Sequence, residues 1–193
     1  HRTSRRQRQM CIRDSEITER LESEGVIRVC VHGRTLKQRY SGTADWDSIN
    51  QIVKSVSIPV IANGDVSDAK SAESCLKVTG AAGLMIGRAA IGRPMIFHTI
   101  KKELGWTEEK PPWQIDDPII ARLWCWERYL TLCHEVYGEL GSKNSKRHAI
   151  SFTKGLPGAS SMRVSLHKAQ SHEQLGRMVS KYLRDLERCA MVH

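Results

Sequence analysis

Two glycine-containing stretches follow apolar runs and carry residue types that can bind an anion. The run in "IPVIANGD" ends at Asn63-Gly64-Asp65, and the run in "AAGLMIGRAAIGRP" ends at Gly87-Arg88. A glycine lets backbone N–H groups approach an anion without an intervening Cβ, and an arginine adds a fixed positive charge. Asn-Gly-Asp alone is also a common turn sequence. The two glycine ends together favour a site for a phosphate-bearing ligand.

A third apolar run is also followed by a glycine with polar or charged neighbours. The stretch "VIRVCVHGRT" is rich in β-branched residues and ends at His32-Gly33-Arg34. His32 precedes Asn63 by 31 positions, and Asn63 precedes Gly87 by 24 positions. These intervals match the length of single βα units. Because ligands bind at the carboxyl ends of parallel strands, we expect the three run ends to contribute to one site.

The segments between these runs predict the elements that position them. Residues 45–56 and 67–78 have the apolar spacing of amphipathic helices, and residues 17–25 read as the end of a helix closed by Gly25. The runs at 26–31, 58–62 and 81–86 read as buried strands. Alternating strands and helices predict right-handed βαβ units and a parallel sheet.

The remainder of the chain predicts helices. Asp117-Pro118 has the types of an N-cap and a first helical residue, and Gly138 would close that helix. A second helix opens at Ser142 and ends at "KGLPG", and a third follows the capping-box sequence "SHEQ" at residues 171–174. The apolar residues of the first and third helices are interpreted as core.

Positive charge is concentrated at the end of the chain. The net charge is +9, and residues 142–193 carry ten Lys and Arg against three acidic residues, a net charge of +7. Residues 16–141 have a net charge of −2. A neutral body with a basic extension is typical of an enzyme core joined to a polyanion-binding element, although a merely solvated extension gives the same pattern. The candidate phosphate contacts are Lys143, Lys146, Arg147, Arg177, Lys181 and Arg184.

Taken together, "VHGRT", "IPVIANGDV" and "GLMIGRAAIGRPMIF" resemble the last three strand ends of the tRNA-dihydrouridine synthases, most closely the bacterial B-type branch. "KRHAISFTKGLPGASSMR" resembles the start of that family's C-terminal helical domain. The resemblance implies an α/β fold, namely the C-terminal part of a TIM-type (β/α)8 barrel (its last three strands) followed by an all-α helical domain.

The resemblance also implies a chemistry, the reduction of uridine in tRNA to 5,6-dihydrouridine with FMN as cofactor and NADPH or NADH as electron donor. By motif, His32, Asn63, Gly64, Asp65, Gly87 and Arg88 would bind FMN. Arg34 would face either the cofactor or the RNA. The implied partners are tRNA and FMN, with no metal, no membrane and a cytoplasmic location.

Several parts of the family pattern do not occur in this sequence. The family's catalytic cysteine loop, its first strand and its Gln and Lys cofactor contacts have no counterpart, so no catalytic residue is assigned. We therefore expect this chain to be the C-terminal part of a longer enzyme and to be inactive alone. The expected domains are a partial FMN-binding barrel at 16–110 and a helical tRNA-binding domain at 111–193. Residues 1–15, with five Arg, resemble a non-native leader and are excluded from the fold.

Composition narrows the alternatives. The six cysteines are scattered without CxxC spacing, which indicates neither a zinc site nor a disulfide framework. No apolar run reaches the length of a membrane span. Two other functions stay open from sequence alone. A dihydroorotate dehydrogenase-like flavoprotein would explain the glycine residues at the strand ends but not the basic segment at residues 142–193. A non-enzymatic RNA-binding module would explain the basic segment but not the glycine residues at the strand ends.

Overall fold

The chain forms two compact units, residues His1–Gly87 and Arg88–His193, in a computed structural model that describes residues 5–114, 117–138 and 144–190. The first unit contains α1 (Arg5–Ser23), β1 (Val29–His32), α2 (Trp46–Ser55), β2 (Val60–Asn63), α3 (Ala69–Thr79) and β3 (Gly83–Met85). The described part of the second unit contains η1 (Arg88–Ala90), α4 (Ile96–Glu103), α5 (Pro118–Tyr137), α6 (Ser145–Thr153), α7 (Ala159–Lys168) and α8 (His172–Ala190).

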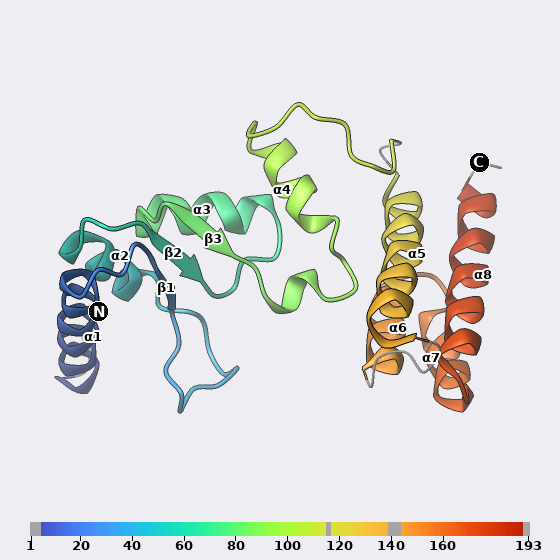
Figure 1. The fold of residues 1–193 in the computed structure, drawn as a ribbon, viewed down its shortest axis with the longest axis horizontal. Helices are drawn as coiled ribbons and strands as arrows, with labels where there is room; N and C mark the ends of the chain where they lie inside the picture. Colours follow the sequence, from blue (N-terminus) through green and yellow to red (C-terminus); the bar gives the residue numbers. More distant parts are fainter. Residues whose placement is uncertain (1–4, 115–116, 139–143, 191–193) are drawn as a thin grey trace. The chain divides into compact units, whose positions relative to one another are not determined.

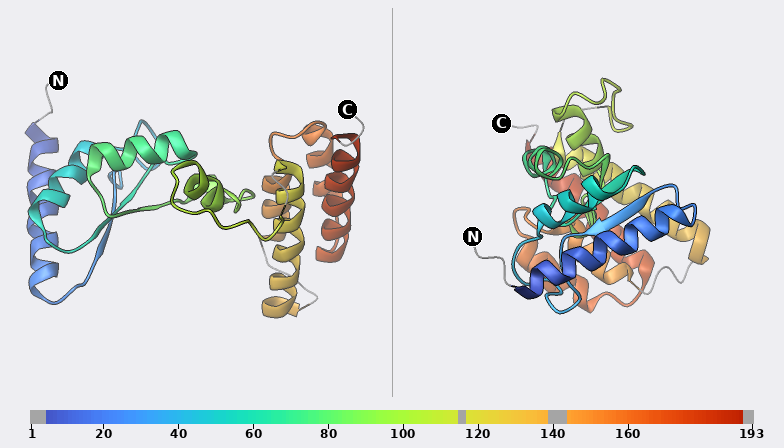
Figure 2. Two further views of the ribbon diagram at one scale, coloured as in Figure 1. Left: turned by 90° about the horizontal axis from the view of Figure 1, so that it is seen from above. Right: turned by 90° about the vertical axis from the view of Figure 1, so that its left-hand side faces the viewer.

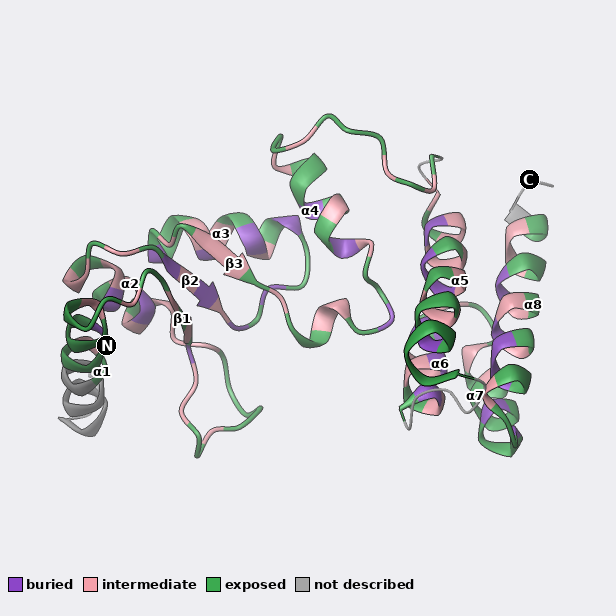
Figure 3. Ribbon diagram, viewed as in Figure 1, coloured by how far each residue is buried: buried purple, intermediate pink, exposed green. Residues whose placement is uncertain are grey.

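The three strands form a parallel sheet in the order β1-β2-β3 (Figure 1). The predicted α/β arrangement of parallel strands and connecting helices is therefore confirmed. Helices α2 and α3 pack on each other and on β2 (Figure 2). Figure 3 shows buried positions along these elements, and Ile49, Ile52 and Ala62 are among the buried residues. The exposed residues of β1 and β3 include Cys30, His32 and Met85, so side chains that could meet a ligand remain accessible along the sheet.

Aspartate side chains determine where the two crossover helices begin. Asp45 accepts a hydrogen bond from Ser48 N at 2.9 Å, and Asp68 accepts one from Ser71 N at 2.8 Å. Helix α3 then ends at Gly80, whose left-handed conformation (φ +66°) closes the last turn. Both helices lie where the sequence predicts them.

The N-terminal leader that sequence analysis excludes from the fold is helical from Arg5 onward. Residues 5–15 contain no glycine or proline, so nothing in them ends a helix that continues to Ser23. The division between the units also differs from the expected boundary near residue 110. Met95 and Trp113 pack against the apolar core of the second unit, which draws the segment between them into that unit.

The second unit has its core between α5, α6, α7 and α8. Figure 3 shows buried positions along these helices, and Trp126, Leu166, Val179 and Leu183 are fully buried in this core. Asp117 caps α5 by accepting from Ile119 N and Ile120 N, and Gly138 ends it, as predicted. Figures 1 and 2 show α5 and α8 side by side. The predicted apolar stripe of α8 faces this core, while its basic residues are exposed.

Candidate functional site

The three strand ends lie side by side in the first unit. His32 is the register partner of Asn63, and Asn63 is the register partner of Met85. The His32 ring Nδ1 lies 3.0 Å from the carbonyl oxygen of Asn63, and Asn63 Nδ2 donates to the carbonyl oxygen of Met85 at 2.8 Å. Because a carbonyl oxygen only accepts, Nδ1 of His32 donates in this contact, and its Nε2 belongs to an exposed side chain. Polar side chains thus join all three strand ends in one row.

The turn after β2 is held by the loop that precedes α2. Gly64 has φ +131° and Asp65 has φ +59°, both outside the region that most residues adopt. A Cβ on Gly64 would stand 2.7 Å from the Cβ of Ala44, and Trp46 Nε1 donates to the carbonyl oxygen of Gly64 at 3.1 Å. Glycine is required at position 64 by this internal contact, whereas the sequence suggested that it leaves room for an anion.

Asp65 is the acceptor of several internal hydrogen bonds. Arg34 Nη2 lies 2.7 Å from Oδ1 and 2.6 Å from Oδ2 of Asp65, and Ala44 N donates to Oδ2 at 2.7 Å. Arg34 also donates to the carbonyl oxygen of Gly42 at 2.8 Å. Only 4% of the Arg34 side chain is exposed, against 29% for Asp65. As the chain is folded here, Arg34 is an internal partner of Asp65.

Gly87 has open space around it. It is exposed two residues after β3, and a Cβ built on it would have no atom within 4 Å. Arg88, also exposed, follows directly in the chain and opens η1, a turn of three residues. The sequence suggested that a helix starts here, but the next α-helix begins only at Ile96. Open backbone beside an arginine is suited to an anionic ligand.

A cavity of about 450 Å³ lies in the first unit beside β1. His32 and Arg34 line it from the end of β1, and Asp45 and Ser48 line it from the start of α2. These residues give it a polar rim, while Ile49 and Ile52 belong to its apolar wall.

The residues at and after the three strand ends form the candidate site. We call His32, Asn63, Gly64, Asp65 and Gly87 the strand-end site.

The basic candidates of the second unit differ in what they contact. Lys146 Nζ donates to the carbonyl oxygens of His167 and Ala169, at 3.0 and 3.1 Å, and so caps the end of α7. Arg177 pairs with Glu173, and Arg184 pairs with Glu127 at 2.6 Å, both on the exposed surface. Arg147 and Lys181 are exposed. Lys143 lies outside the described residues.

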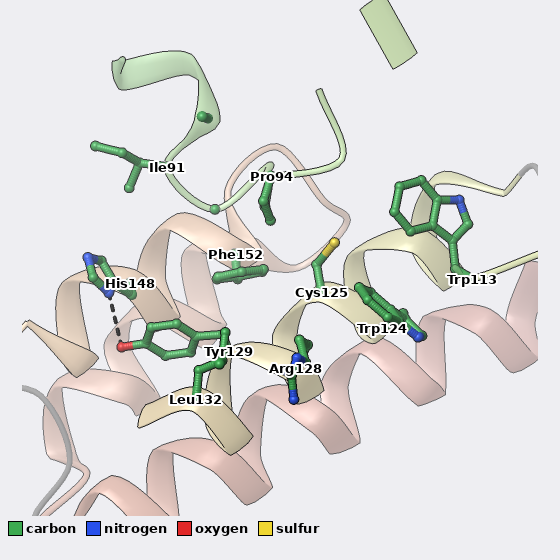
Figure 4. A pocket seen from close by; sticks show the side chains of 12 residues that line it. Ile91, Pro94, Trp113, Trp124, Cys125, Arg128, Tyr129, Leu132, His148 and Phe152 are labelled. Atoms are coloured by element: carbon green, nitrogen blue, oxygen red, sulfur yellow. Dashed lines mark hydrogen bonds between the residues drawn. The ribbon is translucent and has the colours of Figure 1, made fainter. Parts of the chain in front are cut away.

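The second unit also contains an apolar cavity of about 420 Å³ (Figure 4). In Figure 4 Trp124, Cys125 and Tyr129 line it from α5 and His148 from α6, with Tyr129 hydrogen-bonded to His148 Nδ1 at 3.0 Å. Burial raises the pKa of the Cys125 thiol to about 11. Burial, and to a smaller extent the charge of Arg147, lowers the pKa of His148. Both groups are therefore uncharged at neutral pH.

Comparison with known proteins identifies the relatives of this chain. The model of the family described as dihydrouridine synthase matches residues 2–187. The chain belongs to the dihydrouridine synthase family. It is 39% identical over 147 residues to a Rickettsia conorii protein named "Probable tRNA-dihydrouridine synthase", covering 76% of this chain and 43% of that protein. It is 38% identical over 144 residues to tRNA-dihydrouridine synthase B of Pseudomonas putida, covering 74% of this chain and 42% of that protein.

The E. coli K12 relative, also named tRNA-dihydrouridine synthase B, is 40% identical over 134 residues, covering 69% of this chain and 40% of that protein. The chain thus spans about two fifths of the length of the curated family members it matches. The family resemblance read from the sequence motifs is confirmed.

Sequence reasoning missed some residues around the strand-end site. Ala44 and Trp46 contact the turn at Gly64, and Met85 contributes its backbone carbonyl. None carries a motif of its own, because each acts through a contact between segments distant in the sequence. Within the described ranges, no helix is long and apolar enough to cross a membrane, and no group of three or more His, Cys, Asp and Glu residues is arranged to hold a metal ion.

Proposed function

We propose that this chain is part of an FMN-dependent tRNA-dihydrouridine synthase, which reduces uridine in tRNA to 5,6-dihydrouridine with electrons from NADPH or NADH. The observation that carries this proposal is the family match over residues 2–187. A family match alone does not assign a chemistry, so the residues of the strand-end site have to suit the cofactor.

The strand-end site fits a flavin phosphate in three respects. Gly87 leaves its backbone approachable, since no atom lies within 4 Å of where its Cβ would be. Arg88, next in the chain, supplies a fixed positive charge. His32 and Asn63 supply polar groups at the two neighbouring strand ends. In this assignment Gly87 and Arg88 bind the phosphate, and His32 and Asn63 contact the remainder of FMN. When bound, the flavin supplies the reducing chemistry; the protein binds and orients it.

The three parallel strands and their helices would form the last three units of a (β/α)8 barrel, over residues 16–110, with η1 and α4 following the last strand in the chain although the first compact unit ends at Gly87. A barrel binds ligands at the carboxyl ends of its strands, which is where the strand-end site lies. The sheet face carrying Cys30, His32 and Met85, which is exposed here, would face the interior of that barrel.

Residues 111–193 would form the tRNA-binding domain. The net charge of +7 over residues 142–193 supports an RNA partner, because neutralising phosphates drives most non-specific nucleic-acid affinity. Arg147 and Lys181 are the best placed for such contacts, since both are exposed. Arg177 and Arg184 would exchange their surface carboxylate partners for phosphate at little cost, since exposed ion pairs contribute at most about 1 kcal/mol. Lys143 completes the basic group.

The test is the dihydrouridine content of tRNA in cells of the source organism. Deleting the coding region should remove dihydrouridine from at least one tRNA position, as read by mass spectrometry of nuclease digests, and re-introducing the gene should restore it. Unchanged dihydrouridine at every position after deletion would overturn the proposal.

A further inference from the structure

Arg34 joins three segments of the first unit that are distant in the sequence. It follows β1 directly, its Nη2 donates to both carboxylate oxygens of Asp65 after β2, and the same nitrogen donates to the carbonyl oxygen of Gly42 in the loop between β1 and α2. The carboxylate in turn accepts from Ala44 N. One buried guanidinium thereby connects the end of β1, the loop at residues 41–44 and the turn after β2.

We infer that Arg34 is a positioning residue of the flavin site: it holds the turn at Gly64 and Asp65 in its binding geometry and contacts neither the cofactor nor the RNA. This inference rests on the proposed function for its ligand. It also changes the role that the sequence suggested for Arg34, which was a direct contact to one of those partners.

The conformation of the turn explains why it needs such a partner. Asp65 has φ +59°, a left-handed conformation that costs a non-glycine residue free energy and persists only when surrounding contacts fix it. Gly64, at φ +131°, fits against Ala44 with no space for a Cβ. The Asp65 carboxylate accepts hydrogen bonds from both Arg34 and Ala44 N. The same contacts therefore fix the turn and hold Ala44 in contact with Gly64.

Stability alone does not account for this arrangement. Charges removed from water seldom increase net stability, because desolvation offsets their attraction. Arg34 Nη1 is also buried without a hydrogen-bond partner among the residues that the structure describes, which adds a cost that a purely stabilising contact would avoid. The guanidinium of this ion pair is buried, whereas 29% of the Asp65 side chain is exposed. A pair that contributes little net stability but defines the path of a turn has the properties expected of a geometric support.

The support acts on the row of strand ends. The turn carries the carbonyl oxygen of Asn63 that contacts His32 Nδ1, and the Asn63 side chain reaches the carbonyl oxygen of Met85. If the turn at Gly64 loses its conformation, these two hydrogen bonds no longer fix the orientations of the His32 and Asn63 side chains. Loss of Arg34 should therefore weaken flavin binding although the guanidinium itself touches no ligand.

The experiment compares Arg34→Ala with Lys37→Ala, which removes an exposed cation from the same loop. Two quantities are measured: hydrogen exchange of the Ala44 amide, which reports its bond to Asp65, and FMN affinity from flavin fluorescence. Arg34→Ala should accelerate Ala44 exchange and weaken FMN binding, each by at least tenfold, and Lys37→Ala should leave both unchanged. Millimolar guanidinium should restore both quantities in Arg34→Ala, because it can occupy the vacated space, and methylammonium should restore neither.

Asp65→Asn serves as a second variant, because it retains the shape of the side chain and one acceptor; circular dichroism confirms that each variant is folded. It should shift both quantities in the same direction as Arg34→Ala, by a smaller factor. Unchanged Ala44 exchange in folded Arg34→Ala overturns the inference, as does accelerated exchange with undiminished FMN affinity. If the wild-type protein binds no FMN, the flavin part of this inference fails, and the exchange rate of Ala44 still decides whether Arg34 holds the turn; the proposed function is tested separately, by the dihydrouridine content of tRNA after gene deletion.

Discussion

Replacing Gly64 with alanine tests the packing of the turn after β2. Two costs follow from the structure. A Cβ at position 64 would lie 2.7 Å from the Cβ of Ala44, and Gly64 has φ +131°, which L-residues rarely adopt. Backbone strain of this kind costs about 1–3 kcal/mol, and overpacking costs a similar amount. Gly64→Ala should therefore lower the free energy of unfolding by about 2–6 kcal/mol, a large part of the ~5–15 kcal/mol typical of a domain.

The two costs can be separated by a second substitution. Ala44→Gly removes the methyl group that the new Cβ would meet but leaves the backbone conformation as it is. Combined with Gly64→Ala, it should recover about half of the loss, measured by urea unfolding followed by circular dichroism. Gly87→Ala is the matched control, because nothing lies within 4 Å of its Cβ position and its φ lies outside the positive range.

The control also separates stability from binding. Gly87→Ala should change the free energy of unfolding by less than about 0.5 kcal/mol yet weaken FMN binding, because its methyl group occupies the space through which the phosphate approaches. Full stability of Gly64→Ala would refute the packing argument, as would an Ala44→Gly substitution that recovers nothing.

Four further variants address the second unit. Reversing Arg147 and Lys181 to Glu should weaken tRNA binding and flatten its salt dependence with the fold intact. Lys146→Gln should also lower stability, because Lys146 caps α7. Filter binding at three salt concentrations, with parallel melting curves, distinguishes these outcomes, and identical isotherms would exclude Arg147 and Lys181 from the RNA site. Trp126→Ala should cost about 3–5 kcal/mol of unfolding free energy, since Trp126 is fully buried in the core; a loss below about 1 kcal/mol in urea unfolding would contradict that placement. The pKa of His148 is lowered in the folded protein. The contribution of His148 to stability should therefore be complete above the unfolded pKa of about 6.5 and be lost as pH falls through the lower folded value. His148→Gln should remove that part of the pH dependence of the melting temperature, and an unchanged pH profile would count against the buried neutral ring.

Local signals in the sequence predicted most elements of the fold. Asp117 and Gly138 marked the ends of α5, because caps act within one turn of the chain, and apolar spacing predicted α2 and α3. Helix α7 was missed: "KGLPG" was interpreted as the end of a helix, and the next ten residues show no clear apolar period. The capping box at Ser171 was correct in part, since Ser171 Oγ accepts from Gln174 N but Gln174 Oε1 accepts from Gln170 N.

The residues of the strand-end site were predictable, but their partners were not. The sequence placed His32, Asn63 and Gly87 at strand ends because each follows an apolar run. It could not show that Arg34 is buried against Asp65, because that contact joins residues 31 positions apart and depends on the path of the intervening loop. For the same reason Lys146 was assigned to RNA, although its ammonium group caps α7.

The most direct test of the flavin assignment compares the affinity of the protein for FMN and for riboflavin, which lacks the phosphate. Charge-assisted hydrogen bonds of the kind assigned to Arg88 and the Gly87 backbone contribute about 1.5–3 kcal/mol. Isothermal titration should therefore show FMN binding at least tenfold more tightly than riboflavin, and Arg88→Ala should remove most of that difference. Equal affinity for the two flavins would contradict the claim that these strand ends bind a phosphate.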